Sequence, residues 1–213
     1  MLYVRLSADL TQGNYNGTMT LTSGTTMQSI TLSGEVTEGS GFGNNEQTFQ
    51  FAAGLNWWTA NVGITLAQLE AALGSNGIMI SNKEGQYASY NPTYGWGGSL
   101  TSIEAGKMYK IQTNTACEIT LTGPAVNPAD VTITLNPGNN WIGFVGTQSM
   151  SVTNALTNLT PTVGDVISAA NGTYATYTVY GWGGSLQILQ PGNGYIYNSK
   201  AAGETSFTFP LAQ

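Results

Sequence analysis

The sequence predicts a β-rich α+β protein, made of two tandem homologous small domains with one short helix each and a β-sandwich-like segment before them. Three observations lead to this fold class. The seven residues YGWGGSL at 94–100 return unchanged at 180–186. Short runs of alternating apolar and polar residues, separated by Gly and Asn, fill most of the chain. Hydrophobic residues make up 41% of the chain, which is enough for packed cores. A heptamer with one Trp and three Gly does not recur by chance, so the chain contains a duplicated unit.

The first 47 residues are expected to lie outside the duplication. Apolar and polar residues alternate at 2–6, 17–22 and 28–33, as in half-buried strands. We therefore predict a partial Ig-like β segment over 1–38. The stretch at 39–47 contains Gly, Ser and Asn and is expected to be a flexible linker.

The duplicated unit extends to both sides of the heptamer. Three further pairs of segments match: 56–58 with 140–142, 86–90 with 173–177, and 105–109 with 191–195. The offset between the copies drifts only from 84 to 87 residues, and the changes fall in turn-like stretches, where insertions are tolerated. We expect repeat 1 over 48–125 and repeat 2 over 129–213.

Each repeat is expected to begin with two strands, followed by a short helix and a small antiparallel sheet. The helical signal in repeat 1 is Thr65 as N-cap, then Leu66, Leu69 and Leu73 on one side and Gly74 as the stop. Its counterpart in repeat 2 starts at Ser151 and runs to 159, before a proline. The strands expected in repeat 1, each with a partner in repeat 2, are 48–51, 56–59, 78–81, 87–90, 96–103, 108–113 and 118–121.

The residues of repeat 2 resemble a known class of extracellular repeats. LNPGNNWIGF at 135–144 and LQPGNGY at 189–195 look like the "GWNWIS/LEPGKGY" repeats of large extracellular bacterial proteins, whereas repeat 1 departs from this pattern at 53–58 and 104–109. The N-terminal stretch resembles the closing strands of Ig-like modules in bacterial surface proteins, notably of Bacteroidetes. The resemblance implies a surface-exposed stalk or adhesin-like setting, and it carries over no reaction and no catalytic residue.

Composition excludes several function classes. The chain has no His, so Cys117 has no imidazole to activate it, and neither a Ser-His-Asp triad nor a His-ligated zinc can form. Of the eleven acidic residues only Glu118 and Glu204 occupy matching positions, which disfavours a duplicated carboxylate pair as an active site. With a net charge of -6 the chain lacks the basic surface that nucleic acids require. We expect no enzyme activity, no metal, no cofactor and no direct membrane insertion, since no apolar run approaches the ~20 residues that span a bilayer.

The heptamer contains the candidate ligand-binding residues. Its tryptophans, together with nearby tyrosines, are predicted to form an aromatic platform for sugar rings, because sugars have hydroxyls at one edge and C–H groups on a face. The platform residues are Trp96, Trp182, Tyr87, Tyr90, Tyr94, Tyr174, Tyr177 and Tyr180. The alternative is a tyrosine-rich core with each Trp as a plug beneath the helix. Trp57 and Trp141, in strand-like surroundings, are expected to fill the core.

These observations favour a non-catalytic extracellular module, secreted or at the cell surface, with a structural stalk or adhesion role and with glycans or other surface proteins as partners. The alternative is a carbohydrate-binding module that uses Trp and Tyr stacking, appended to an enzyme or part of a phage fibre.

Overall fold

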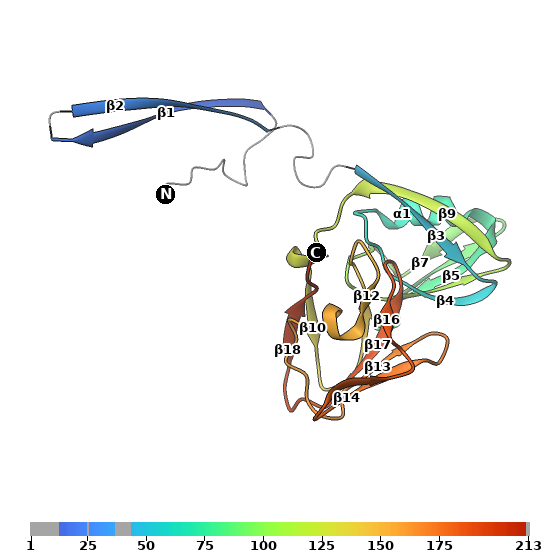
Figure 1. The fold of residues 1–213 in the computed structure, drawn as a ribbon. Coiled ribbons are helices and arrows are strands. Elements are labelled where there is room, and N and C mark those ends of the chain that lie inside the picture. The colour runs from blue at the N-terminus through green and yellow to red at the C-terminus, as the bar shows by residue number, and fades with distance from the viewer. Residues whose placement is uncertain (1–12, 25, 37–43, 212–213) are drawn as a thin grey trace. The chain divides into compact units, whose positions relative to one another are not determined.

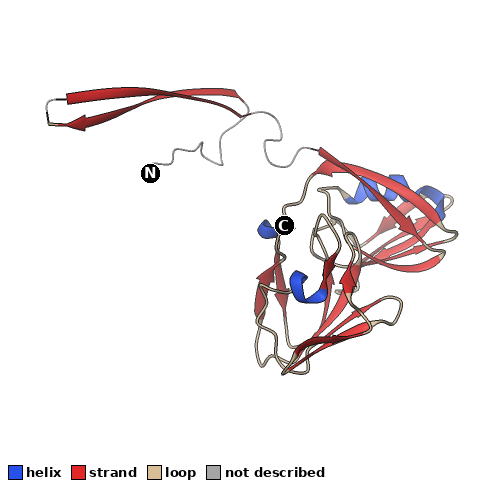
Figure 2. Cartoon of the chain, viewed as in Figure 1, coloured by secondary structure: helices blue, strands red, loops and turns tan. Residues whose placement is uncertain are grey.

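The computed structural model describes residues 13–24, 26–36 and 44–211, and contacts group the chain into two units, Met1–Gly43 and Asn44–Gln213 (Figure 1). The described part is mainly β with two short α-helices (Figure 2). The mainly β character predicted from the sequence is confirmed. Most of the predicted linker lies outside the described residues, and the first strand of the second unit begins at Asn44.

The first unit contains one antiparallel hairpin, formed by β1 (Gly13–Ser23) and β2 (Thr26–Val36). Both strands cover the predicted runs at 17–22 and 28–33, whereas the run at 2–6 lies outside the described residues. Side chains alternate between the two faces, and most of the apolar ones gather on one face through pairs such as Met19 with Ile30, whereas Met27 lies on the other face. Leu21, on the same face as Met19, remains 49% exposed.

The second unit is built around two five-stranded antiparallel sheets with the same strand order. The first sheet has the order β4 (Gly54–Trp58), β8 (Tyr109–Thr113), β5 (Gly77–Ser81), β6 (Tyr87–Asn91), β7 (Gly95–Gly98). The second has the order β11 (Gly138–Gly143), β17 (Gly194–Ser199), β13 (Val166–Ala169), β14 (Tyr174–Thr178), β15 (Gly181–Gly184).

Each sheet has a smaller two-stranded companion that covers its core. β3 (Asn44–Phe51) pairs with β9 (Cys117–Pro124), and β10 (Thr132–Leu135) pairs with β18 (Thr205–Thr208). A 3-10 turn, η2 (Pro128–Asp130), precedes β10. A short additional pair, β12 (Met150–Ser151) with β16 (Ile188–Leu189), lies only beside the second sheet among the described residues.

The two helices differ in length. α1 (Leu66–Leu73) begins after Thr65, whose hydroxyl accepts from the Gln68 backbone N–H. The Gln68 side-chain oxygen in turn accepts from the Thr65 backbone N–H, which completes a capping box. It ends in the 3-10 turn η1 (Gly74–Asn76). α2 (Val152–Ala155) is a single turn, shorter than the helix predicted to 159. The segment predicted to be helical, VTNALTNL at 152–159, is rich in Thr and Asn, which compete with helical hydrogen bonds.

Each sheet packs on its own hydrophobic core, and the same register positions supply both. In the first core Ile80 of β5 lies between Ala88 and Ile111. In the second, Ile167 of β13 takes the same place, between Ala175 and a tyrosine of β17. The cores therefore differ mainly in which side chains fill equivalent positions.

Candidate functional site

The repeated heptamer forms the edge hairpin of each five-stranded sheet. In the first sheet Trp96 of β7 pairs with Tyr90 of β6, and their ring centroids lie 5.8 Å apart. In the second, Trp182 pairs with Tyr177 at 5.3 Å. Both tryptophans are half-buried and pack against the hydrophobic cores. The structure thus brings one Trp and one Tyr together in each hairpin, at the edge of the core.

The other predicted platform residues point elsewhere. Tyr94 and Tyr180 lie in the hairpin turns and are 87% and 97% exposed. Tyr87 and Tyr174 are about half exposed and lie on the opposite face of their strands from Tyr90 and Tyr177, because side chains alternate along a strand. Among the described residues, no ring contact joins these four tyrosines to the tryptophans. The eight candidate residues therefore face several directions.

Most of the remaining heptamer residues have a structural task. Gly95 has φ of 75° at the turn, a conformation that favours glycine. A Cβ on Gly98 would lie 2.1 Å from the Tyr87 carbonyl oxygen. The Ser99 hydroxyl accepts from the Tyr87 N–H, and the Leu100 N–H donates back to the Tyr87 oxygen. These bonds end β7 at Gly98, earlier than the strand predicted over 96–103.

Two adjacent glycines of the heptamer are expected to respond differently to alanine. Gly98→Ala should cost at least about 2 kcal/mol of unfolding free energy, since its Cβ would meet the Tyr87 carbonyl and its φ of 155° is unfavourable for an L side chain. Gly97→Ala should change stability by less than about 1 kcal/mol, because open space surrounds its Cβ position. Urea denaturation of both variants checks this, and equal losses would contradict it.

Backbone contacts join the two sheets, and each kind of contact occurs twice. The second occurrence uses the same two positions of the repeat with the copies exchanged. The Thr59 N–H donates to the Gly192 oxygen at 3.0 Å, and the Gly143 N–H donates to the Gly106 oxygen at 2.8 Å. In the alignment of the copies Thr59 matches Gly143 and Gly106 matches Gly192. The β-bridges Trp58–Asn193 and Lys107–Ile142 are related in the same way. Such reciprocal contacts are those of a two-fold interface.

At two further places, a residue of one copy lies against the residue that occupies the same position in the other copy. A Cβ on Gly143 would lie 2.0 Å from Thr59 Oγ1, and a Cβ on Gly194 would lie 2.1 Å from Met108 Cγ. Gly194 is the equivalent of Met108. A residue touches its own equivalent only next to the two-fold axis. The local pseudo-two-fold axis therefore passes between these pairs, and a side chain from one copy fills the space that a glycine leaves in the other.

The junction forms two clefts at equivalent places. The first, here called the neutral cleft, has a volume of about 470 Å³ and is lined by residues 48–52, 55–58, 169–171 and 191–195. The second, here called the charged cleft, has a volume of about 220 Å³ and is lined by 82–84, 104–108, 132–134, 136 and 140–142. Each segment of one cleft matches a segment of the other. Among the described residues, none that lines the neutral cleft is charged, whereas the charged cleft contains Lys83, Glu84, Glu104 and Lys107.

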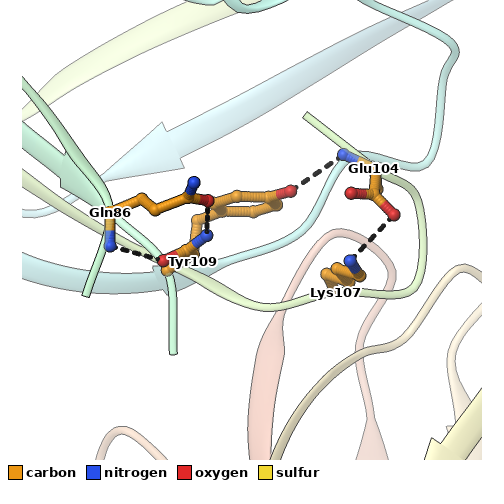
Figure 3. Close-up of polar contacts among 5 residues, drawn as sticks. Gln86, Glu104, Lys107 and Tyr109 are labelled. Atoms are coloured by element: carbon orange, nitrogen blue, oxygen red, sulfur yellow. Dashed lines mark hydrogen bonds and ion pairs between the residues drawn. The ribbon is translucent and has the colours of Figure 1, made fainter. Parts of the chain in front are cut away.

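Figure 3 shows the polar contacts beside the charged cleft. The Tyr109 hydroxyl accepts from the Glu104 backbone N–H at 2.9 Å, and the Glu104 carboxylate pairs with Lys107 at 2.8 Å. The hydrogen bond to Glu104 raises the pKa of Lys107. In the second copy the Tyr195 hydroxyl accepts from the Gln190 N–H at 2.7 Å. The tyrosine at this position anchors the loop that lines each cleft.

Buried tyrosines predict loss of stability in alkali. Burial raises the pKa of Tyr109, Tyr195 and Tyr197 in the folded protein, whereas an unfolded tyrosine titrates near pH ~10. A raised folded pKa contributes stability that is complete below the unfolded pKa and is lost as pH rises toward the folded one. We expect urea midpoints to be insensitive to these groups up to about pH 9 and to fall above about pH 10. Phenolate absorbance that rises for these tyrosines before unfolding would contradict this.

Trp57 and Trp141 do not fill the core, contrary to the sequence prediction. Both are half-buried and line the neutral and the charged cleft, respectively. Their neighbours Trp58 and Ile142 point inward instead, each 2% exposed. Lys110 lies between the two copies, with Nζ 5.7 Å from the Trp57 ring centroid and 4.4 Å from that of Trp141. The outward position follows from strand alternation, since only one of two adjacent residues can face the core.

The Asn before each outward Trp stabilises the preceding turn. Asn56 Nδ2 donates to the carbonyls of Ala52 and Gly54, and its Oδ1 accepts from the Ala52 N–H. Asn140 makes the same bonds in the second copy. This side chain is therefore occupied by structural bonds, and the Trp beside it is held on a rigid strand.

Within the described part of the chain, no cluster of three or more His, Cys, Asp or Glu side chains is placed to hold a metal ion. No helix there is long and apolar enough to cross a membrane. Comparisons with protein-family models, with curated proteins and with solved structures find no match for the chain.

Proposed function

We propose that this protein is a non-catalytic extracellular module with a structural stalk or adhesion role, secreted or at the cell surface, in which two homologous domains act as one rigid body. The observation that carries the proposal is the reciprocal junction, where the Thr59–Gly192 and Gly143–Gly106 bonds tie both copies together. Tandem domains that share such an interface resist bending more than domains on a free linker. The likeness to GWNWIS/LEPGKGY-type repeats and to the end of an Ig-like module supports the extracellular setting.

The structural tasks of the heptamer residues support the same proposal. Gly95, Gly98, Ser99 and Leu100 shape the edge hairpin, and Trp96 closes the edge of the core. A sequence repeated for these reasons serves the fold of each copy. Other surface proteins and glycans are the proposed partners of the assembled module.

Mechanical unfolding tests the rigid-body role. The whole chain, held by handles at its two ends, should unfold residues 44–213 in one step, because neither copy keeps its junction surface covered without the other. Two separate steps of roughly equal length would contradict the proposal. Protease treatment of intact source cells tests the location, since an internal protein would be protected from digestion.

Carbohydrate binding at the heptamer hairpins is the second candidate function. One observation favours it: Tyr94 and Tyr180 are almost fully exposed at the hairpin turns, and exposed aromatic rings can stack on sugars. The double variant Tyr94→Ala/Tyr180→Ala should then lose glycan binding without losing stability. Unchanged binding would exclude these turns as the site.

A further inference from the structure

We propose that the neutral cleft at the junction of the two copies is a binding site for an uncharged sugar, with the pyranose ring stacked on Trp57. This inference goes beyond the structural role and rests on the same junction of the two copies. It also places the sugar away from the heptamer hairpins.

The size and position of the cleft suit a small ligand. Its volume of about 470 Å³ lies within the range of about 300–1,000 Å³ that is usual for small-molecule sites. One wall comes from β3 and β4 of the first copy, and the other comes from the β13–β14 turn and the loop before β17 of the second. The site is therefore complete only when both copies are packed together.

The apolar wall presents a flat surface on a rigid strand. Trp57 and Leu55 lie on the same face of β4, where Leu55 is 54% exposed and Trp57 is half-buried. Trp57 is held by the β4–β8 pairing opposite Lys110 and by the turn bonds of Asn56. A π face attracts polarised C–H groups, and a preformed position lowers the entropy cost of binding.

The opposite wall offers neutral hydrogen-bonding groups. Asn171 is exposed, and its Oδ1 accepts from the backbone N–H and hydroxyl of Thr173, which leaves its Nδ2 as a donor for a ligand. Asn193 and Gln50 add further exposed amides. The Gln50 Nε2 donates to the Glu118 carboxylate, which leaves its Oε1 as an acceptor, and the Asn193 side chain also bonds to Tyr195. Amides can both donate to and accept from hydroxyl groups. A ligand with an apolar face and a rim of hydroxyls matches this combination, and this is the chemistry of a pyranose.

Charge selects for a neutral sugar. None of the described residues that line the cleft is a Lys or Arg, and the nearby Lys110 Nζ lies closer to the Trp141 ring (4.4 Å) than to the Trp57 ring (5.7 Å). The chain has a net charge of -6. The equivalent position of Ala170 in the charged cleft is Lys83, and that of Asn171 is Glu84. The charged cleft is also less than half as large. The two clefts occupy equivalent positions, but only the neutral cleft has the size and the uncharged lining that a neutral sugar requires.

The test is a titration of the full chain with glucose, galactose, mannose, N-acetylglucosamine, cellobiose and lactose. Binding is measured by saturation-transfer NMR and by calorimetry. Sugar concentrations up to about 20 mM cover millimolar Kd values. We expect saturable binding of at least one sugar, and weaker binding of glucuronic acid than of glucose. Trp57→Ala and Ala170→Lys should each raise Kd at least about tenfold. Lys83→Ala, in the charged cleft, should leave Kd unchanged within about twofold.

Any of the following results would overturn the proposal. These are no binding of any sugar in the panel, binding that survives both Trp57→Ala and Ala170→Lys, and binding lost only in Tyr94→Ala/Tyr180→Ala. Displacement of the sugar panel by a polyproline peptide that itself binds the cleft more tightly would also overturn it, in favour of a peptide site. Thermal unfolding of each variant monitors folding, and Ala170→Lys carries the test if Trp57→Ala unfolds, since Ala170 is exposed.

Discussion

Gly143→Thr is expected to destabilise the second unit by at least about 3 kcal/mol, the upper part of the range for overpacked sites. The substitution gives both copies the same residue at the pseudo-two-fold axis. The new Cβ would lie 2.0 Å from Thr59 Oγ1 and 2.2 Å from Thr59 Cβ, so the sheets would have to separate. Gly143 is buried and its φ is not positive, so the cost arises at the junction and not in the backbone. Urea denaturation measures it.

The control is the exchanged pair, Thr59→Gly with Gly143→Thr. This double variant moves the threonine to the other copy and restores one side chain facing one glycine. We expect it to recover most of the lost stability, apart from about 0.5–1 kcal/mol for a new glycine in an ordered strand end. A double-mutant cycle should show a coupling energy of several kcal/mol. Additive effects of the two changes would contradict the position of the axis.

Asp165→Ala is expected to cost about 3–5 kcal/mol, because three neutral donors lose their acceptor and each unsatisfied buried donor costs about 1–3 kcal/mol. Asp165 is 2% exposed. Its carboxylate accepts from the Tyr197 hydroxyl at 2.6 Å, the Lys200 N–H at 2.6 Å and the Thr162 N–H at 2.9 Å. Alanine would leave all three donors without this acceptor. The loss should be visible as a lower urea midpoint.

Two comparisons make this expectation specific. Asp130→Asn, at an exposed position, should change stability by less than about 0.5 kcal/mol. Asp165→Asn should lose less than the alanine variant, because its amide oxygen still accepts from some of the donors. If Asp165→Ala lost no more than Asp130→Asn, the carboxylate would not hold these segments together.

The Asp165 network also shows how the two copies diverge. The equivalents of Asp165 and Tyr197 in the first copy are Ile78 and Ile111. The first copy therefore packs apolar side chains where the second copy buries a hydroxyl–carboxylate pair. Nothing in the local pattern of repeat 2 predicted this pair, because a single Asp after a Gly reads as an exposed turn residue.

The sequence alone determined the mainly β character, the positions of most strands and the capped helix after Thr65. These features depend on short-range signals: alternation at period two, glycines where φ is positive, and a Thr three residues before a Gln. The end of β7 at Gly98 was missed, since it depends on a close approach to the Tyr87 carbonyl across the hairpin.

Only the tertiary structure decided which aromatic residues are accessible and where the copies meet. Alternation shows that Trp57 and Trp58 face opposite sides, but which side is covered depends on residues more than 80 positions away, such as Asn193. Gly143 and Gly194 likewise look like ordinary strand glycines until Thr59 and Met108 are seen against them. The junction and its clefts arise from packing of two surfaces, and that packing energy has no local signature in the chain.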